Sequence, residues 1–303
     1  MATAQFGQLL AQFRQLLAQA KRVVVLTGAG VSAESGIPTF RGAGGLWRKY
    51  DATMLATPQA FARDPSLVWE FYHYRREVVS RCRPNPGHVA LAAYERKAAA
   101  QGQHFVLITQ NIDRLHQAAG SASVVEMHGS LWDVVGATAA GFRDPARPPW
   151  EDRRQPLVPA LAGSGSPDGQ PADIPVEELP HDDQGQLLRP GVVWFNENLD
   201  DAVIDRIENE LDEADLLLII GTSSVVYPAA GYAPQVAQRG VPVVEINLEP
   251  TDNSRVCRMS IQGRAGELLP ELLGVADDAA VAAAVAEQCS SSSSSSAGRR
   301  GSR

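Results

Sequence analysis

Short apolar segments separated by helical stretches constrain the fold of this chain more than any other feature. They are hydrophobic along almost their whole length, without the polar–apolar alternation of strands that have one wet face. Strands buried on both faces by helices have this pattern, which is typical of a parallel sheet. The sequence therefore predicts an α/β fold with strands at Arg22–Thr27, His104–Thr109, Val192–Phe195, Asp215–Gly221 and Val241–Asn247.

Two segments interrupt this alternation. Residues 42–99 contain two helical stretches, and residues 136–185 are rich in Pro, Gly and Asp with little periodicity. We interpret both as insertions that form a smaller domain over the strand ends. The main domain then comprises residues 1–41, 100–135 and 186–275. The tail, residues 276–303, ends in a low-complexity serine run, and we expect it to be disordered from about residue 290.

The composition argues against several classes of function. The net charge of −8 gives no basic surface for nucleic acid, and no apolar run is long enough to span a bilayer. Three scattered cysteines, Cys82, Cys257 and Cys289, provide neither a disulfide framework nor a cysteine zinc site. We therefore expect an intracellular protein, in the cytoplasm, and a monomer. Residues 6–20 repeat Leu and Phe at helical spacing and lead into the first strand, so we assign them to the fold; a mitochondrial presequence is the alternative.

A glycine-rich turn, residues 28–36, follows the first predicted strand and reads GAGVSAESG. Glycines let the backbone turn tightly and bring N–H groups against a pyrophosphate at a helix N-terminus. Ala33 replaces the third glycine of the dinucleotide fingerprint, and no acidic residue closes a second strand at the usual distance. Taken alone, the turn is either a dinucleotide site or a strand-to-helix connection that needs glycine only for its geometry.

Five strings in order along the chain favour the dinucleotide site. Each is weak alone, but together, from Gly28 to about Gly266, they closely resemble the signatures of the sirtuin family. They are GAGVSAESGIPTFRGAGGLWRKYD from residue 28 to 51, Gln110-Asn111-Ile112-Asp113, His128-Gly129, Gly221-Thr222-Ser223 and Asn247-Leu248-Glu249. The resemblance implies a Rossmann-like NAD-binding domain of the sirtuin and deoxyhypusine-synthase kind. It also implies an enzyme that uses NAD to remove acyl groups from the lysines of partner proteins, without nucleic acid or membrane partners.

The resemblance also implies which residues bind the cofactor. Residues 28–47 would surround the diphosphate and the nicotinamide ribose, and polar residues after later strands would hold nicotinamide and the adenosine ribose. Open α/β sheets bind ligands at these carboxyl ends of strands. The implied set is Gly28, Ala29, Gly30, Ser32, Glu34, Ser35, Gly36, Phe40, Arg41, Trp47, Gln110, Asn111, Ile112, Asp113, Gly221, Thr222, Ser223, Asn247, Leu248, Glu249 and Ala265.

His128 is the predicted catalytic base, with Asn111 and Asp113 as catalytic partners. In the mechanism that the resemblance implies, the acyl oxygen attacks C1′ of the nicotinamide ribose and a base then deprotonates a ribose hydroxyl. Histidine suits this step because its pKa lies near neutrality. His128 follows the apolar run Val124–Met127, so we expect it exposed at a strand end. We interpret the other histidines as surface or packing residues: His73, His88, His104, His116 and His181.

A second segment resembles the sirtuin region that pairs with the substrate backbone and lines the acyl-lysine tunnel. Its letters fit a plain core strand equally well, so only the resemblance assigns it to substrate binding. The segment consists of Val192, Val193, Trp194 and Phe195.

Tyr72 and Arg75 lie three residues apart and share one face of a predicted helix. Their Tyr-x-x-Arg spacing resembles class III sirtuins, which remove succinyl, malonyl and glutaryl groups, and Ala56 lies where that class keeps a small residue. A guanidinium beside a phenol hydroxyl is a suitable receptor for a carboxylate. The alternative is that Arg75 pairs on the surface with Glu70 or Glu77.

The chain departs from the family at the structural zinc, which sirtuins usually hold on four cysteines. The corresponding regions, residues 131–140 and 179–188, contain no cysteine, and by register Gly136 and Ala139 occupy the first ligand positions. His181, Asp182 and Asp183 make a poor tetrahedral site. We therefore predict that the small domain retains a remnant of the zinc module without metal, and no zinc cofactor.

The predicted function is NAD-dependent removal of succinyl, malonyl or glutaryl groups, and weakly of acetyl groups, giving nicotinamide, O-acyl-ADP-ribose and free lysine. A general deacetylase, a non-catalytic NAD or ADP-ribose sensor and an ADP-ribosyltransferase are the alternatives. Intact His128, Asn111 and Asp113 argue against the sensor, because a pure binding protein does not require that set.

Overall fold

The computed structural model describes residues 3–39 and 46–297, with side chains described from residue 6 to residue 290 within those ranges. A six-stranded sheet forms the centre, and all of its pairings are parallel. Its strand order is β11-β10-β9-β1-β4-β5. The strands are β1 (Arg22–Thr27), β4 (His104–Thr109), β5 (Val124–Glu126), β9 (Leu216–Ile220), β10 (Val243–Asn247) and β11 (Met259–Gln262).

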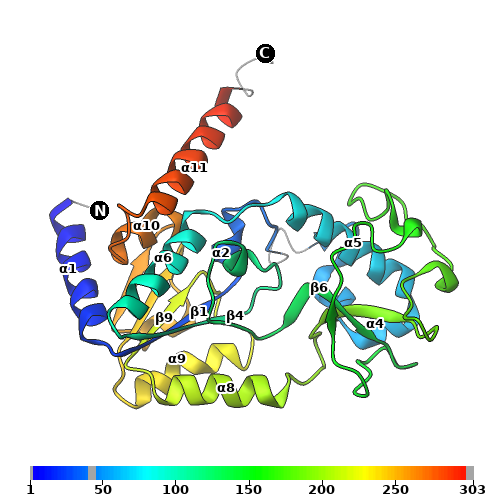
Figure 1. Cartoon of the computed structure of the whole chain (residues 1–303), viewed down its shortest axis with the longest axis horizontal. Coiled ribbons are helices and arrows are strands. Elements are labelled where there is room, and N and C mark those ends of the chain that lie inside the picture. The colour runs from blue at the N-terminus through cyan, green and yellow to red at the C-terminus, as the bar shows by residue number, and fades with distance from the viewer. Residues whose placement is uncertain (1–2, 40–45, 298–303) are drawn as a thin grey trace.

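Helices cover both faces of this sheet, as Figure 1 shows. Alternate residues of each strand point to opposite faces, so Val23 and Val25 enter one core cluster and Val24 and Leu26 the other. One face carries α1 (Thr3–Gln19), α6 (Pro86–Ala100), α10 (Ala265–Leu272) and α11 (Ala279–Ala297). The other carries α8 (Asp201–Asp212) and α9 (Ala229–Gln238). This arrangement confirms the predicted Rossmann-like fold.

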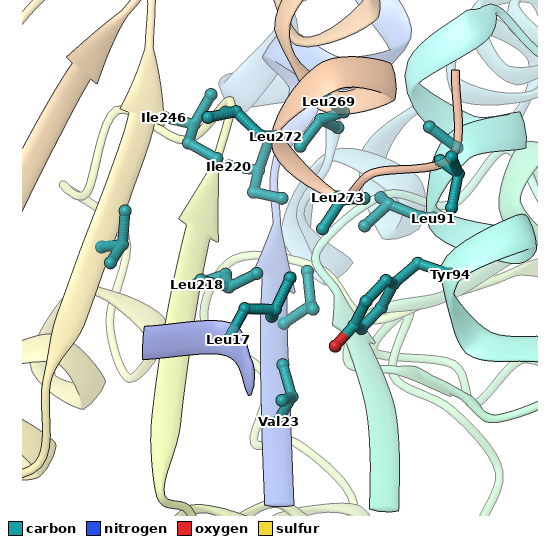
Figure 2. Close-up of a cluster of buried hydrophobic side chains, with 14 of the residues drawn as sticks. Leu17, Val23, Leu91, Tyr94, Leu218, Ile220, Ile246, Leu269, Leu272 and Leu273 are labelled. Atoms are coloured by element: carbon teal, nitrogen blue, oxygen red, sulfur yellow. The ribbon is translucent and has the colours of Figure 1, made fainter. Parts of the chain in front are cut away.

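The N-terminal helix α1 belongs to the first of these cores. Phe13 and Leu17 are buried in it, and Figure 2 shows Leu17 beside Val23 and Leu218 of the sheet. Burial of two large apolar side chains stabilises the docked helix, each by roughly 1.5–3 kcal/mol. The assignment of residues 6–20 to the fold is therefore confirmed.

The smaller domain consists of helices around an antiparallel sheet of strands β7-β6-β8. Its core is rich in aromatic side chains, among them Trp47, Trp69, Trp132 and Trp194. Its strands are β2 (Leu46–Trp47), β3 (Tyr50–Asp51), β6 (Gly129–Gly136), β7 (Trp150–Glu151) and β8 (Leu188–Val192). Its helices are α3 (Ala52–Leu55), α4 (Pro58–Arg63) and α5 (Pro65–Arg81), with 3₁₀ turns η2 (Pro159–Leu161) and η3 (Val176–Glu178).

The packing differs from the predicted domain bounds at three elements. Helix α6, expected in the small domain, buries Leu91 and Tyr94 against the central sheet. Strands β6 and β8, expected in the main domain, pair with each other in the small sheet. The prediction that Val192–Phe195 forms a parallel strand is therefore wrong, since β8 ends at Val192. A short apolar run does not reveal which sheet it joins, and that ambiguity explains the error.

The tail also differs from expectation, because α11 continues to Ala297. The helix begins in an alanine-rich stretch, and alanine is the strongest helix former. Extending an existing helix adds one hydrogen bond per residue fixed, so propagation into the serine run is far easier than starting a helix there. Residues 298–303 lie outside the described residues. None of the described helices is long and apolar enough to cross a membrane.

Candidate active site

A cavity of about 1240 Å³ lies where the carboxyl ends of the central strands face the small domain. Both regions contribute to its walls. The floor comes from the loops after β1, β4, β9 and β10, and the opposite wall from α5 and the segment after β8. Open parallel sheets bind ligands at this edge, so this cavity is the candidate active site.

The glycine turn after β1 packs closely on the loop after β9. The Gly30 N–H donates to the carbonyl oxygen of Gly221 over 2.7 Å. A Cβ at Gly30 would lie 2.7 Å from that oxygen, and one at Gly28 would lie 2.7 Å from the Cβ of Thr222. Side chains would force the two cavity-lining loops apart. The glycines are thus required by the packing of the floor, whatever the loop also does for a phosphate.

A buried polar network fixes the residues after β4. The Ser32 hydroxyl donates to Asp113 Oδ2 over 2.7 Å, and the Asn111 amide donates to Ser32 Oγ and to the carbonyl of Gly28. Burial raises the pKa of Asp113, against the opposing effects of the Leu115 N–H, the Ser32 hydroxyl and the Arg75 charge. Asn111 and Asp113 are therefore held in one orientation relative to the glycine turn.

Two neutral histidines lie beneath this network, as the sequence analysis expected of packing residues. The rings of His88 and His116 are 4.8 Å apart, and they contact Ser32 and Thr27 respectively. Burial lowers the pKa of His116 to about 3 and holds that of His88 well below its usual value. Both rings are thus uncharged near pH 7. No sequence pattern indicated that His88 contacts the glycine turn.

His128 lies in the turn between β5 and β6, half-buried, with its side chain on the cavity wall. Its Nδ1 lies 3.0 Å from the carbonyl oxygen of Gln110. A carbonyl only accepts, so this contact requires the proton on Nδ1 and makes Nε2 the basic nitrogen. The predicted position just after a strand is confirmed, but the side chain is half-buried and not exposed. The His128 carbonyl accepts a hydrogen bond from Val193 N and so joins the two walls.

The loops after β9 and β10 form the far end of the floor. Gln110 Nε2 donates to Thr222 Oγ1 over 3.0 Å, and Asn247 Nδ2 donates to the Thr222 carbonyl over 2.9 Å. Behind them the buried carboxylate of Glu245 accepts hydrogen bonds from the hydroxyls of Thr251, Ser254 and Ser260. These bonds anchor residues 251–254 and the cavity wall that they form.

The opposite wall contains the residues expected to bind substrate. Ala56, Tyr72 and Arg75 line the cavity, together with Val192, Val193, Trp194 and Phe195. Arg75 lies 5.3 Å from the centre of the Tyr72 ring. The acids considered as alternative partners are engaged elsewhere: Glu70 with Arg48 at 2.8 Å, and Glu77 with His73 and Arg81. Arg75 therefore faces the cavity and not a surface carboxylate.

The structure brings most of the expected cofactor residues to the cavity, but not all. Trp47 is buried in the small domain, where its indole donates to the carbonyl of Gly165. Glu34 accepts from the N–H of Gly266 at the start of α10, and Ser35 accepts from Asn85. Phe40 and Arg41 lie outside the described residues. The expected residues that are described but do not line the cavity are Glu34, Ser35, Gly36, Trp47 and Ala265.

Sequence reasoning also missed several wall residues. Val226, Tyr227 and Pro228 follow the Gly-Thr-Ser string, and Thr251 and Asp252 follow Asn-Leu-Glu. The sequence feature that could have indicated these residues is their position directly after the family-like strings Gly221-Thr222-Ser223 and Asn247-Leu248-Glu249. The histidines other than His128 do not line the cavity among the described residues.

The fold and the site together define an α/β protein with a large cavity at the strand ends that contains a histidine oriented by a backbone carbonyl. Residues 28–228 match the Sir2 family, so the chain belongs to the Sir2 family. It is 54% identical over 259 residues to the mitochondrial NAD-dependent protein deacylase sirtuin-5 of Canis lupus familiaris, covering 84% of this chain and 81% of the relative. Identity to the protein of the same name from Xenopus tropicalis is 53% over 256 residues, 83% of this chain and 81% of the relative.

Solved structures agree with this assignment. The crystal structure of a Sir2 homologue in complex with NAD superposes with a TM-score of 0.74 at 42% identity, covering 89% of this chain and 94% of that one. A Sir2 homologue bound to ADP-ribose superposes with a TM-score of 0.73 at 41% identity, covering 92% and 97%.

Proposed function

We propose that this protein is an NAD-dependent protein-lysine deacylase that prefers acyl groups ending in a carboxylate. One observation carries the proposal: a single cavity joins His128, the Ser32–Asn111–Asp113 network and the Tyr72–Arg75 pair. The reaction requires a general base, a surface that binds a dinucleotide and a cationic pocket for the acyl carboxylate. The names of the sirtuin-5 relatives support the same activity.

The donor set of the floor fits NAD. Hydrogen-bonding groups of the glycine turn and of Thr222 and Ser223 suit the phosphates, and those of Asn247 and Glu249 suit the adenosine ribose. When bound, NAD supplies the ribose carbon that receives the acyl oxygen and releases nicotinamide. Asn111 turns its amide nitrogen toward the glycine turn, so its amide oxygen is directed to accept from a ribose or water hydroxyl.

His128 acts as the general base. Because its Nδ1–H is donated to Gln110, Nε2 carries the lone pair that takes a proton from the attacking hydroxyl. The nearby hydrogen bond from Val193 to the His128 carbonyl aligns the ring with the substrate segment. The same ring, once protonated, returns its proton as the acyl product forms.

Arg75 and Tyr72 select the acyl group. Burial lowers the pKa of Arg75, yet a guanidinium remains charged at any physiological pH. A carboxylate carried into this partly apolar wall is costly unless it is paired, and Arg75 supplies the pairing charge. Ala56 leaves room beside them. Succinyl, malonyl and glutaryl groups are thus preferred over acetyl, which has no charge to pair.

We further propose that the protein works as a monomer and without zinc or nucleic acid. Within the described part of the chain, no group of three or more His, Cys, Asp and Glu residues is placed to hold a metal ion. For the compartment, the relatives named as mitochondrial favour the mitochondrion, and nothing in the comparisons supports the cytoplasm that the sequence led us to expect.

Mass spectrometry of one reaction tests the activity. The purified protein is incubated with NAD and a succinyl-lysine peptide, and separately with the acetylated and the unmodified peptide. A deacylase gives O-succinyl-ADP-ribose, nicotinamide and free lysine in equal amounts. An NAD sensor gives none of these, and an ADP-ribosyltransferase adds ADP-ribose to protein instead, so either result contradicts the proposal.

A further inference from the structure

A chain of hydrogen bonds connects the acyl end of the cavity to a buried ion pair in the small domain. The indole Nε1–H of Trp194 donates to the hydroxyl oxygen of Tyr72 over 2.7 Å. Both side chains are almost completely buried and line the cavity. Indole nitrogen is only a donor, so the Tyr72 oxygen is the acceptor in this contact.

Trp194 is itself fixed by its surroundings. Its backbone N–H donates to Glu197 Oε2 over 2.9 Å, and the Arg189 guanidinium stacks 3.5 Å from the centre of its ring. Arg189 is fully buried, pairs with Glu197 at 2.5 Å and donates to the carbonyls of Gly141 and Val192. The indole N–H therefore keeps its direction.

The Arg75 guanidinium lies close to the same side chain, 5.3 Å from the centre of the Tyr72 ring. A phenol oxygen offers two acceptor sites and one proton. With Trp194 donating to one of these acceptor sites, the hydroxyl proton must point away from the indole. The hydrogen bond that Tyr72 is thereby oriented to offer the acyl group is a donated one.

We propose that Trp194 is a specificity-positioning residue: by donating to Tyr72, it turns the Tyr72 proton toward the acyl group and makes the pocket select carboxylate ends. A carboxylate accepts but never donates, so it matches a pocket with two donors, Tyr72 and Arg75. The neutral methyl of an acetyl group gains nothing from either. The inference rests on the proposed acyl preference and adds to it a residue that acts through Tyr72.

The test is a double-mutant cycle of Trp194→Phe and Tyr72→Phe, read as the ratio of kcat/KM for succinyl-lysine to that for acetyl-lysine. Trp194→Phe keeps an aromatic ring under Arg189 but removes the N–H. We expect it to lower the ratio about tenfold, mainly through KM, because a hydrogen bond to a charged group is worth that much. In the Tyr72→Phe background, Trp194→Phe should change the ratio by less than about twofold, since the group through which it acts is gone.

Trp69→Phe is the matched control. It also removes a buried indole hydrogen bond in the small domain, from Trp69 Nε1 to the carbonyl of Leu188 at 2.9 Å, but Trp69 does not line the cavity. We expect Trp69→Phe to lower the melting temperature about as much as Trp194→Phe does, without changing the ratio of kcat/KM for succinyl-lysine to that for acetyl-lysine. If Trp194→Phe does not fold, 3-benzothienylalanine at position 194, which replaces only the N–H by sulfur, serves instead.

Additive effects of the two substitutions, or an unchanged ratio in Trp194→Phe, would overturn the role of Trp194. That failure is distinct from failure of the proposed function. If the wild type does not prefer succinyl-lysine, or Arg75→Met lowers both substrates equally, then the acyl preference is wrong and the role of Trp194 is refuted with it.

Discussion

The two walls of the cavity are stabilised in different ways. The floor rests on a parallel sheet whose strands are apolar on both faces, and its polar groups come from loops that directly follow those strands. The opposite wall belongs to a domain with little regular structure between residues 137 and 187. There, buried arginines donate to backbone carbonyls and hold the loops together.

Arg76 is one example. It donates to the carbonyls of Leu131, Asp152 and Arg154, and it stacks 5.1 Å from the centre of the Trp132 ring. Burial lowers its pKa to about 10, so it remains charged at neutral pH. One such side chain joins β6 to the segment after β7.

The region predicted to be a remnant of the zinc module is also held together by side chains. Asp182 accepts from the backbone N–H groups of Gln184 and Gln186 and from Arg147, and the amide of Gln186 donates to Asp144. A Cβ at Gly136, a family ligand position, would lie 2.6 Å from Gln186 Oε1. The Gln186 side chain thus packs directly against Gly136. Polar cross-links to the backbone therefore hold this loop-rich region together, whereas apolar packing holds the sheet beneath the floor.

The largest expected effect falls on the floor side. Replacing His128 by Ala removes the general base and should lower kcat for deacylation by about 10²–10⁴-fold. NAD affinity, measured by calorimetry, should change little, because the ring acts on a hydroxyl and not on the phosphates. Turnover near that of the wild type would show that another group is the base.

Arg189→Met should be the most damaging change on the opposite wall. It leaves Glu197 buried without its partner, a loss of roughly 3–5 kcal/mol in free energy of unfolding. Hydrogen exchange should rise in β6 and β8 before it rises in β1 and β4. Arg264→Met, which removes an exposed contact to Glu267 at 3.8 Å, is the control and should cost less than about 1 kcal/mol. Equal loosening of both regions would mean that the two walls do not differ in this way.

Arg75→Met tests whether the opposite wall selects the acyl group. We expect kcat/KM for succinyl-lysine to fall about 10- to 100-fold, mainly through KM, with a much smaller change for acetyl-lysine. The measurement compares both peptides in both proteins. Parallel losses would assign Arg75 to the fold and make the protein a general deacylase.

The two neutral histidines beneath the floor predict a pH dependence of stability. Their folded pKa values lie below the unfolded value of about 6.5, that of His116 at about 3. Below pH 6.5 the unfolded chain binds more protons than the folded one. Lowering the pH therefore lowers the free energy of unfolding, by about 1.4 kcal/mol per pH unit for each histidine. In His116→Gln the free energy of unfolding between pH 6.5 and 4 should depend less steeply on pH, by about 1.4 kcal/mol per pH unit. An unchanged slope would contradict a buried neutral His116.

The smallest expected effect is that of chelators. If side chains close the remnant, EDTA should change neither the melting temperature nor the deacylase rate, and elemental analysis should find no stoichiometric zinc. One zinc per chain, with a lower melting temperature after chelation, would show that the ligand set has been misjudged.

Strands β1 and β4 were predicted with their observed bounds, because a strand buried on both faces has a pattern that depends only on its own residues. Trp47 was misplaced for the opposite reason. It follows the cofactor turn in sequence, but its indole is buried against Phe71 and Gly165 in the small domain. Sequence proximity to a motif does not fix which way a large apolar side chain turns.

The sequence by itself determined the α/β class, strands β1 and β4 and the place of His128 just after an apolar run, since each depends on local periodicity or on a short string of residues. Only the tertiary structure decided that β6 and β8 pair with each other, that α6 covers the central sheet and that Trp194 donates to Tyr72. The last contact joins residues 122 positions apart. Contacts at that separation follow from how the elements pack in three dimensions, and no local pattern of residue types encodes them.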